Sequence, residues 1–204
     1  MRNRPLLVGI TGGIGSGKSV VCNIFDLLGV PIYHADECAK LLLNKDQEVI
    51  DSIKVSFGEK AYLSNGEVDR QFLANHVFSD PKKLKIINSI VHPAVARDFE
   101  EWCLKKQKHL YLIKEAALLV ETGSYQCLDF LVTVTAPVDL RVSRVLARDQ
   151  HRTKEQVLQI ISNQSSEEEK TSRSKFILLN DNHTLVIPQV LEIHNFFNNY
   201  VQAG

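Results

Sequence analysis

One short segment near the start of the chain constrains its fold more than any other. Residues 12–19 read Gly12-Gly13-Ile14-Gly15-Ser16-Gly17-Lys18-Ser19, after an apolar run at 6–11 and at the opening of a helical pattern that ends near Leu28. Glycines let the backbone curl so that successive N–H groups point inward, and the following helix adds its positive end. This is the G-x-x-x-x-G-K-[ST] phosphate-loop pattern, which predicts a nucleoside-triphosphate site.

The residue types in this loop indicate which groups would contact the nucleotide and its Mg²⁺ ion. The predicted nucleotide-binding residues are Gly13, Ile14, Gly15, Ser16, Gly17, Lys18, Ser19 and Val20. Lys18 can reach the β- and γ-phosphates, and Ser19 is placed to ligate Mg²⁺. The alternative is a glycine-rich turn that binds nothing, which the full match between a strand and a helix disfavours. Gly13-x-Gly15 is weak as a dinucleotide fingerprint, because Lys18 occupies the place of the last glycine.

The composition of the 204-residue chain argues against several other classes. Its 24 Lys and Arg balance its 24 Asp and Glu, which argues against a nucleic-acid binder. The four cysteines form no C-x-x-C pair for zinc or redox chemistry. No apolar run approaches a membrane span, and the run at 6–10 is shorter than a signal-peptide core. We expect a soluble, cytoplasmic protein without nucleic-acid or membrane partners; its oligomeric state is not readable.

Short apolar runs alternate with longer helical stretches along the chain. Strands are expected at residues 6–11, 30–33, 110–113, 130–135 and 176–179. This alternation predicts an α/β fold with a parallel sheet flanked by helices. About 75 mostly helical residues separate the second and third strands, far more than an ordinary crossover needs. There a helix starting at Asp80-Pro81 is expected to be interrupted at His92-Pro93, with a further helix from about Ala94.

We expect a single domain built from three parts. The core covers about residues 1–60 and 108–204, a helical insertion covers about 61–107, and a small lid covers about 141–155. The insertion is either a substrate cover or an elaborated crossover without a function of its own, and the pattern leaves both readings open.

Two classes of P-loop protein compete, a GTPase-like switch and a small-molecule kinase. Residues 26–29 match D-x-x-G but fall on the helix after the loop, and residues 44–47 place Gln47 where a guanine-reading aspartate should stand. The kinase is therefore favoured. A kinase needs a carboxylate at the acceptor hydroxyl, and Asp36 follows the second strand, where ligands of parallel sheets bind. Its alternative role is that of an N-cap for the next helix.

Arg141, Arg144 and Arg148 stand at helical offsets of three and four residues. They predict a lid helix whose cations stabilise the transferring phosphoryl group and whose closure excludes water. The alternative is a solvated basic face paired with Asp139 and Asp149.

The acid that positions the metal is less well defined. Glu115 after the third strand and Glu121 are both candidates, and water with substrate phosphates could complete the shell instead. Beyond the arginines, Thr153 and Gln156 form a predicted capping box.

A set of segments in fixed order runs through nearly the whole chain. It begins with residues 9–19 and continues with Ala35-Asp36, Asp69-Arg70, Val77-Phe78-Ser79-Asp80-Pro81, Val91-His92-Pro93, Leu118-Leu119-Val120-Glu121, Arg144 with Arg148-Asp149, Gln164-Ser165 with Glu167-Glu168, and Asn180-Asp181. Together these segments closely resemble the bacterial dephospho-coenzyme A kinases.

The resemblance implies a P-loop kinase that uses ATP to phosphorylate the ribose 3′-hydroxyl of dephospho-coenzyme A. The products are coenzyme A and ADP, in the last step of coenzyme A synthesis. Asp36 matches the catalytic carboxylate of the family, and Arg144 and Arg148 match its lid; with Lys18 they form the expected catalytic set. His92 would lie in a helical substrate-binding region near the coenzyme A moiety, and a packing role for it stays open. Mg²⁺ is the expected cofactor.

The sequence departs from the family pattern at several positions. Val20 stands where many members have threonine, and His34 replaces the first aspartate of the usual D-A-D. The missing carboxylate is expected to change the local affinity for anions or the titration of Asp36. The other departures are Ala117 in place of proline, and Lys175 and Leu179 in place of acidic residues.

Three functional alternatives stay open at this point. They are a kinase for another alcohol or a nucleoside monophosphate, a nucleotide-dependent switch, and a binding module that has lost catalysis.

Overall fold

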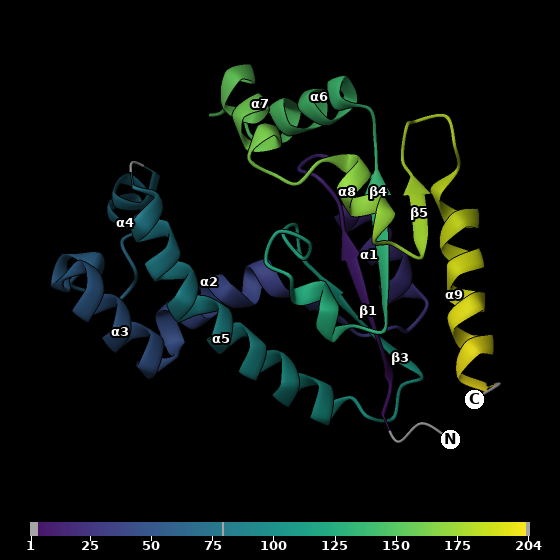
Figure 1. Cartoon of the computed structure of the whole chain (residues 1–204), viewed down its shortest axis with the longest axis horizontal. Helices are drawn as coiled ribbons and strands as arrows, with labels where there is room; N and C mark the ends of the chain where they lie inside the picture. Colours follow the sequence, from purple (N-terminus) through teal and green to yellow (C-terminus); the bar gives the residue numbers. More distant parts are fainter. Residues whose placement is uncertain (1–3, 79, 203–204) are drawn as a thin grey trace. The chain divides into compact units, whose positions relative to one another are not determined.

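In the computed structural model, which describes residues 4–78 and 80–202, the larger of two compact units is built on a five-stranded parallel sheet (Figure 1). The strand order is β2-β3-β1-β4-β5. The strands are β1 (Leu6–Thr11), β2 (Ile32–His34), β3 (Tyr111–Glu115), β4 (Phe130–Thr135) and β5 (Phe176–Leu179). All five predicted strands are present, and the second and third lie one or two residues further along the chain than expected. The predicted α/β fold is therefore confirmed.

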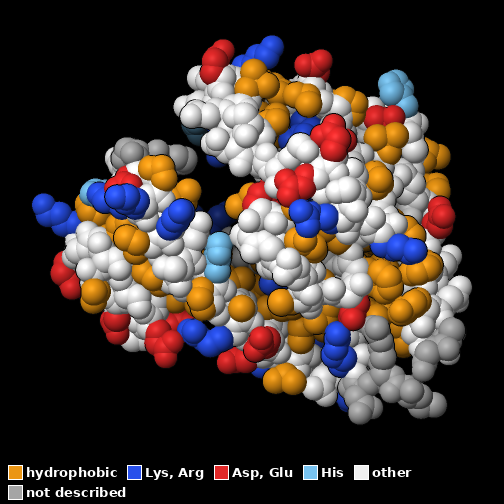
Figure 2. Space-filling model, viewed as in Figure 1, with side chains coloured by type: hydrophobic (Ala, Val, Ile, Leu, Met, Phe, Trp, Pro, Cys, Tyr) orange, Lys and Arg blue, Asp and Glu red, His pale blue; other side chains and the backbone are white. Residues whose placement is uncertain are grey.

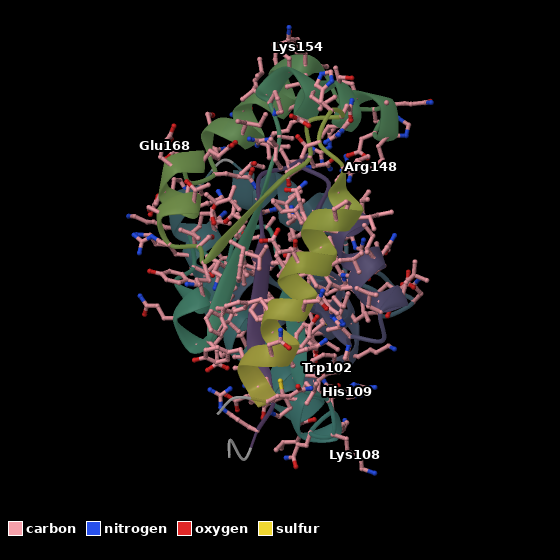
Figure 3. The ribbon with its side chains drawn as sticks, turned by 90° about the vertical axis from the view of Figure 1, so that its right-hand side faces the viewer. Trp102, Lys108, His109, Arg148, Lys154 and Glu168 are labelled. Carbon is pink, nitrogen blue, oxygen red and sulfur yellow. The ribbon has the colours of Figure 1, made fainter. Side chains whose placement is uncertain are left out.

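Two helices cover one face of the sheet. They are α1 (Lys18–Leu27) and α9 (Val186–Gln202); α9 lies beside β5 in Figure 1 and in front of the sheet in Figure 3. The apolar residues of both helices form one cluster with the alternate residues of β1 that face them, Leu6, Val8 and Ile10. Strands buried on both faces read as nearly continuous apolar runs, which is why the sequence revealed them.

The sheet brings the carboxyl ends of β1 and its neighbours to one edge. β1 pairs with β3 on one side and with β4 on the other, and Ile10 is opposite Glu115. Such a reversal of strand order leaves a crevice beyond the strand ends, where ligands of open α/β sheets bind. The helices α6 (Val138–Arg148), α7 (Lys154–Ser162) and α8 (Glu167–Ser172) connect β4 to β5, and the 3₁₀ helix η2 (Ser124–Cys127) precedes β4.

A second compact unit, from Ala35 to Lys105, consists of helices. It contains α2 (Ala35–Lys45), α3 (Gln47–Phe57), the 3₁₀ helix η1 (Glu59–Ala61), α4 (Arg70–Phe78) and α5 (Pro81–Lys105). Its core combines Val49 and Ile53 with Leu73 and Ala94. The helical unit thus starts at Ala35 and not near residue 61, because α2 and α3 pack on α5.

The expected break at His92-Pro93 is wrong. Helix α5 is continuous over 25 residues, with Pro93 inside it. Proline removes one helical hydrogen bond, but Ile87 and Ile90 before it and Ala94 after it all pack in the same apolar cluster, which holds the two halves together. The start of α5 is as predicted: Pro81 is its first residue, and the Asp80 carboxylate accepts the Lys82 N–H at 2.9 Å. Ser79 lies outside the described residues.

No helix in the described ranges is both long and apolar enough to span a membrane. In the face shown in Figure 2, acidic and basic side chains are interspersed, in line with the zero net charge of the chain.

A chain of hydrogen bonds through His194 links the amino-terminal end of β3 to α9. The buried Tyr111 hydroxyl lies 2.6 Å from Nδ1 of His194, and Nδ2 of Asn198 lies 2.9 Å from Nε2 of the same ring. Burial lowers the pKa of His194. A second ring proton would place an N–H against the Asn198 amide N–H, so the neutral imidazole fits this site.

We predict that this histidine makes stability depend on pH. Because its folded-state pKa lies below the unfolded value of about 6.5, its contribution is present above that pH and is lost as the pH falls. Urea unfolding between about pH 7.5 and 5 should show a steeper loss of unfolding free energy for the wild type than for His194→Gln, which cannot titrate. Equal slopes for the two proteins would contradict this assignment.

Candidate phosphate-binding site

Side chains from distant parts of the sequence pack tightly against the loop between β1 and α1. A Cβ on Gly13 would lie 2.0 Å from Nη2 of Arg141, and one on Gly17 would lie 2.1 Å from Nδ2 of Asn180. Gly17 also has φ +94°, a left-handed conformation that L side chains rarely adopt, and it is the N-cap of α1. The glycines therefore serve close packing under the loop as well as its curvature.

The lysine and the two hydroxyls of the loop have different environments. Nζ of Lys18 donates to the Gly12 carbonyl at 2.9 Å, so its ammonium lies over the loop itself. Ser19 and Val20, in the first turn of α1, are exposed, whereas Ser16 is buried. Within the described residues, Oγ of Ser16 has no hydrogen-bond partner. The loop thus presents a cation and an accessible hydroxyl at the carboxyl edge of the sheet.

Arg144 reaches this loop through two asparagines. Its Nη2 donates to Oδ1 of Asn180 at 3.2 Å and to Oδ1 of Asn182 at 2.6 Å, and Nδ2 of Asn180 donates to the Ser16 carbonyl at 2.9 Å. Nη1 of Arg144 is buried, has no hydrogen-bond partner among the described residues, and lies 3.8 Å from the position of a Cβ on Gly17. A guanidinium with a buried, unused N–H beside a phosphate loop is an arrangement that favours an anion.

The three arginines of α6 do not act as one face. Arg141 is buried and donates from Nε to the Ile14 carbonyl at 2.9 Å. Arg148 is exposed at the end of α6 and pairs with Asp149 through two hydrogen bonds of 2.9 and 3.0 Å (Figure 3). This pair raises the pKa of Arg148 and lowers that of Asp149, chiefly through the side-chain hydrogen bond. The structure therefore brings Arg144 to the loop and leaves Arg148 with a carboxylate.

Arg148 lines an open hollow of about 560 Å³ with residues 149–152. Arg152 contributes a second cation there and donates to the same Asp149 carboxylate at 3.2 Å. The capping box predicted after this loop is present, with Thr153 and Gln156 joined by hydrogen bonds of 3.0 and 3.3 Å. The residues of the expected lid thus include an exposed cluster of cations.

The two candidate acids have different environments. Glu121 accepts hydrogen bonds from Nζ of Lys170 at 2.7 Å and from the Ser165 N–H at 2.9 Å, so its Oε1 is occupied by structural contacts. Glu115 ends β3 with its Oε2 3.3 Å from Nδ1 of His34. Glu115 is opposite Ile10 of β1, two residues before the phosphate loop, and is therefore the stronger candidate.

Asp36 and His92 both belong to the helical unit. Asp36 is exposed and is the second residue of α2, two positions after the end of β2. It lies inside the first turn of the helix, so it is not the N-cap. His92 is an exposed residue of α5. A groove of about 650 Å³ in this unit is lined by parts of α2, α3 and α5, and neither residue is among those that line it.

A single glycine can test the close packing under the loop. We predict that Gly17→Ala greatly weakens ATP binding, because the new methyl group displaces the Asn180 amide from the Ser16 carbonyl. Gly123→Ala is the matched control: Gly123 is also a left-handed N-cap, at φ +71°, but nothing lies within 4 Å of its added Cβ. Both variants should lose about 1–2 kcal/mol of stability, and only the first should lose affinity in calorimetric titration with ATP. Equal affinities would refute the packing argument.

Comparison with known proteins places the chain in one family. The family model described as dephospho-CoA kinase matches residues 6–185. A dephospho-CoA kinase from Bacteroides fragilis is 38% identical over 189 residues, which cover 93% of this chain and 91% of the relative. Another from Chlorobaculum tepidum is 38% identical over 184 residues, which cover 87% of each chain.

Solved structures agree with these relatives. A Thermus thermophilus protein superposes with a TM-score of 0.82 at 33% identity, covering 97% of this chain and 98% of the other. A dephospho-CoA kinase from Campylobacter jejuni (TM-score 0.69, 23% identity, 93% and 95% coverage) and a shikimate kinase from Bacteroides thetaiotaomicron (0.52, 12%, 95% and 98%) share the fold. With a family model matched over most of its length and relatives this similar, the chain belongs to the dephospho-CoA kinase family.

Proposed function

We propose that this chain transfers the γ-phosphoryl group of ATP to the ribose 3′-hydroxyl of dephospho-coenzyme A, giving coenzyme A and ADP. A bond forms between the 3′-oxygen and the γ-phosphorus, the bond from that phosphorus to the bridging oxygen breaks, and the hydroxyl proton leaves. The observation that carries the proposal is the phosphate loop with the buried, unused N–H of Arg144 beside it, in a member of this family.

The loop and its cations would bind the triphosphate. Gly13, Gly15, Gly17 and the first residues of α1 would supply backbone N–H groups, Lys18 would exchange its bond to the Gly12 carbonyl for phosphate oxygens, and Arg144 would add a second cation. These donors are held by protein contacts before ATP arrives, so little reorganisation is needed as charge develops on the transferring group.

The residues present fit a Mg²⁺ ion. Ser19 exposes its hydroxyl at the start of α1, and Glu115 stands opposite Ile10, two residues before the loop, with its side chain 14% exposed. We assign Ser19 as a direct ligand and Glu115 as the acid that positions the metal. When bound, Mg²⁺ neutralises charge on the phosphate oxygens.

Asp36 would orient the acceptor hydroxyl and take its proton. Its place in the first turn of α2, directly after β2, puts a carboxylate on the chain where the sheet edge ends and the helical unit begins. The helical unit, residues 35–105, would bind the rest of dephospho-coenzyme A, with His92 near the coenzyme A moiety. No other group is needed to accept this proton, because a carboxylate can do so late in phosphoryl transfer.

The segment around residues 141–155 would act as the lid. Arg148 and Arg152 line the hollow at its tip, and Arg148 would leave Asp149 to stabilise the transferring phosphoryl group. Closure would exclude water, which otherwise competes as acceptor. We also propose a cytoplasmic location, because none of the four described cysteines forms a disulfide, as expected in a reducing compartment.

The first experiment measures ADP formation from ATP and Mg²⁺ with dephospho-coenzyme A, with nucleoside monophosphates, and with no acceptor. We expect strong stimulation by dephospho-coenzyme A alone, and a loss of about 10²-fold or more in Lys18→Ala, because the ammonium stabilises the transferring phosphate. Stimulation by a nucleoside monophosphate instead would replace the proposed acceptor. No stimulation by any acceptor would favour a switch or an inactive binder.

The role of Asp36 has its own test. Asp36→Asn should lower kcat by about 10²–10⁴-fold with little change in the affinity for ATP, because the lost carboxylate acts on the acceptor. Glu37→Gln is the matched control, since Glu37 is the neighbouring exposed acid in the same turn of α2. Steady-state kinetics and ATP titration distinguish the outcomes: equal losses in ATP binding and rate would indicate a metal-binding or structural role for Asp36.

A further inference from the structure

The third residue of the phosphate loop is held by side chains at both of its backbone groups. The Ile14 N–H donates to Oε1 of Gln164 at 2.9 Å, and the Ile14 carbonyl accepts from Nε of Arg141 at 2.9 Å. Ile14 stands between two glycines, so its peptide groups would otherwise be the most free to rotate in the loop. Two fixed side chains thus determine the direction of these peptides.

Gln164 is itself firmly anchored. It lies in the short segment between α7 and α8, and the next residue, Ser165, donates its N–H to Glu121 at 2.9 Å and accepts from Nζ of Lys170 at 2.7 Å. Lys170 is only 2% exposed and pairs with the same Glu121 carboxylate at 2.7 Å. A buried ion pair with good hydrogen bonds therefore holds the segment that carries Gln164.

Arg141 is anchored equally well on the other side. It is 6% exposed, in the second turn of α6, and its guanidinium covers Gly13. Burial lowers its pKa, which the Glu167 carboxylate, 3.8 Å from Nη1, partly offsets. Arg141 stands near the start of α6, and Gln164 follows the end of α7. Arg141 thus lies at the first residue of the expected lid, and Gln164 lies beyond its end, just after α7.

We propose that Gln164 and Arg141 are positioning residues that fix the Ile14 peptides before ATP binds. The Ile14 N–H donates to Gln164, so this donor maintains the shape of the loop, and the N–H groups of Gly15, Gly17 and the first residues of α1 would bind the phosphates. Fixing the loop in advance removes the cost of ordering it on binding. The inference rests on the proposed function, since it assumes that the loop binds ATP, and it adds two residues that do not touch the reacting atoms.

Gln164→Met tests this most directly, because methionine keeps the length of an unbranched side chain and removes the acceptor. We expect the ATP KM and the dissociation constant for a non-hydrolysable ATP analogue to rise about 5- to 20-fold, the range for one hydrogen bond to a group left unsatisfied. kcat and the KM for dephospho-coenzyme A should change less than about 2-fold. Gln159→Met, at an exposed position of α7, is the matched control and should change none of these.

A loss of ATP affinity without a comparable change in kcat or in the KM for dephospho-coenzyme A distinguishes a positioning role from a structural one. A merely structural role would lower the melting temperature and the active fraction, and so kcat, without moving the ATP KM. Unchanged ATP affinity in Gln164→Met would overturn the inference, and so would tighter binding, which would mean that the Ile14 N–H belongs to the nucleotide.

A second variant tests the other contact. Arg141→Lys keeps the charge and removes the planar Nε–H, and it should weaken ATP binding by a similar factor. In the double variant the two losses should not add, because both act on the same residue; full additivity would contradict a shared clamp. If Arg141→Lys does not fold, Gln164→Met decides alone. Failure of the wild type to phosphorylate dephospho-coenzyme A would instead remove the proposed function, while analogue binding still tests the loop.

Discussion

The site depends on how closely other parts of the chain approach the phosphate loop from below. Cβ atoms at Gly13 and Gly17 would overlap the Arg141 and Asn180 side chains, and one at Gly15 would lie 2.4 Å from the Arg141 carbonyl. These contacts come from α6 and from the end of β5, more than a hundred residues away in sequence. They reach the loop because β4 pairs with β1, and β5 pairs with β4 in turn. The loop is therefore shaped by the sheet as much as by its own glycines.

The sequence predicted the parts of the fold that follow from local pattern. Strands buried on both faces are apolar runs, so the first, fourth and fifth were located to the residue. The break at Pro93 was wrong because a proline rule is local, whereas Ile87, Ile90 and Ala94 share one apolar cluster that outweighs one lost hydrogen bond. The start of the helical unit was missed for a similar reason, since only the packing of α2 and α3 on α5 shows where they belong.

The place of the loop between β1 and α1 was predictable from its motif, whereas the environments of the arginines were not. Arg141, Arg144 and Arg148 have the same spacing and the same chemistry, so the sequence placed them on one face. Their environments differ because the partners come from elsewhere: the Ile14 carbonyl, two asparagines and a neighbouring aspartate. Gln164 could be noticed only as part of a family-like segment, because its contact with Ile14 spans 150 residues.

The different hydrogen-bond partners of Arg144 and Arg148 also suit these residues to different steps, ATP binding and lid closure. Arg144 is held by neutral amides, so its full charge is available to a triphosphate without the loss of an ion pair. Arg148 shares its charge with Asp149 and must give up two hydrogen bonds before it can act elsewhere. That cost is small at an exposed site, where solvent and salt screen an ion pair. In the proposed mechanism, Arg144 therefore binds ATP in the open enzyme. Arg148 leaves Asp149 only after the lid closes, when its attraction to the charge on the transferring phosphoryl group exceeds its attraction to the Asp149 carboxylate.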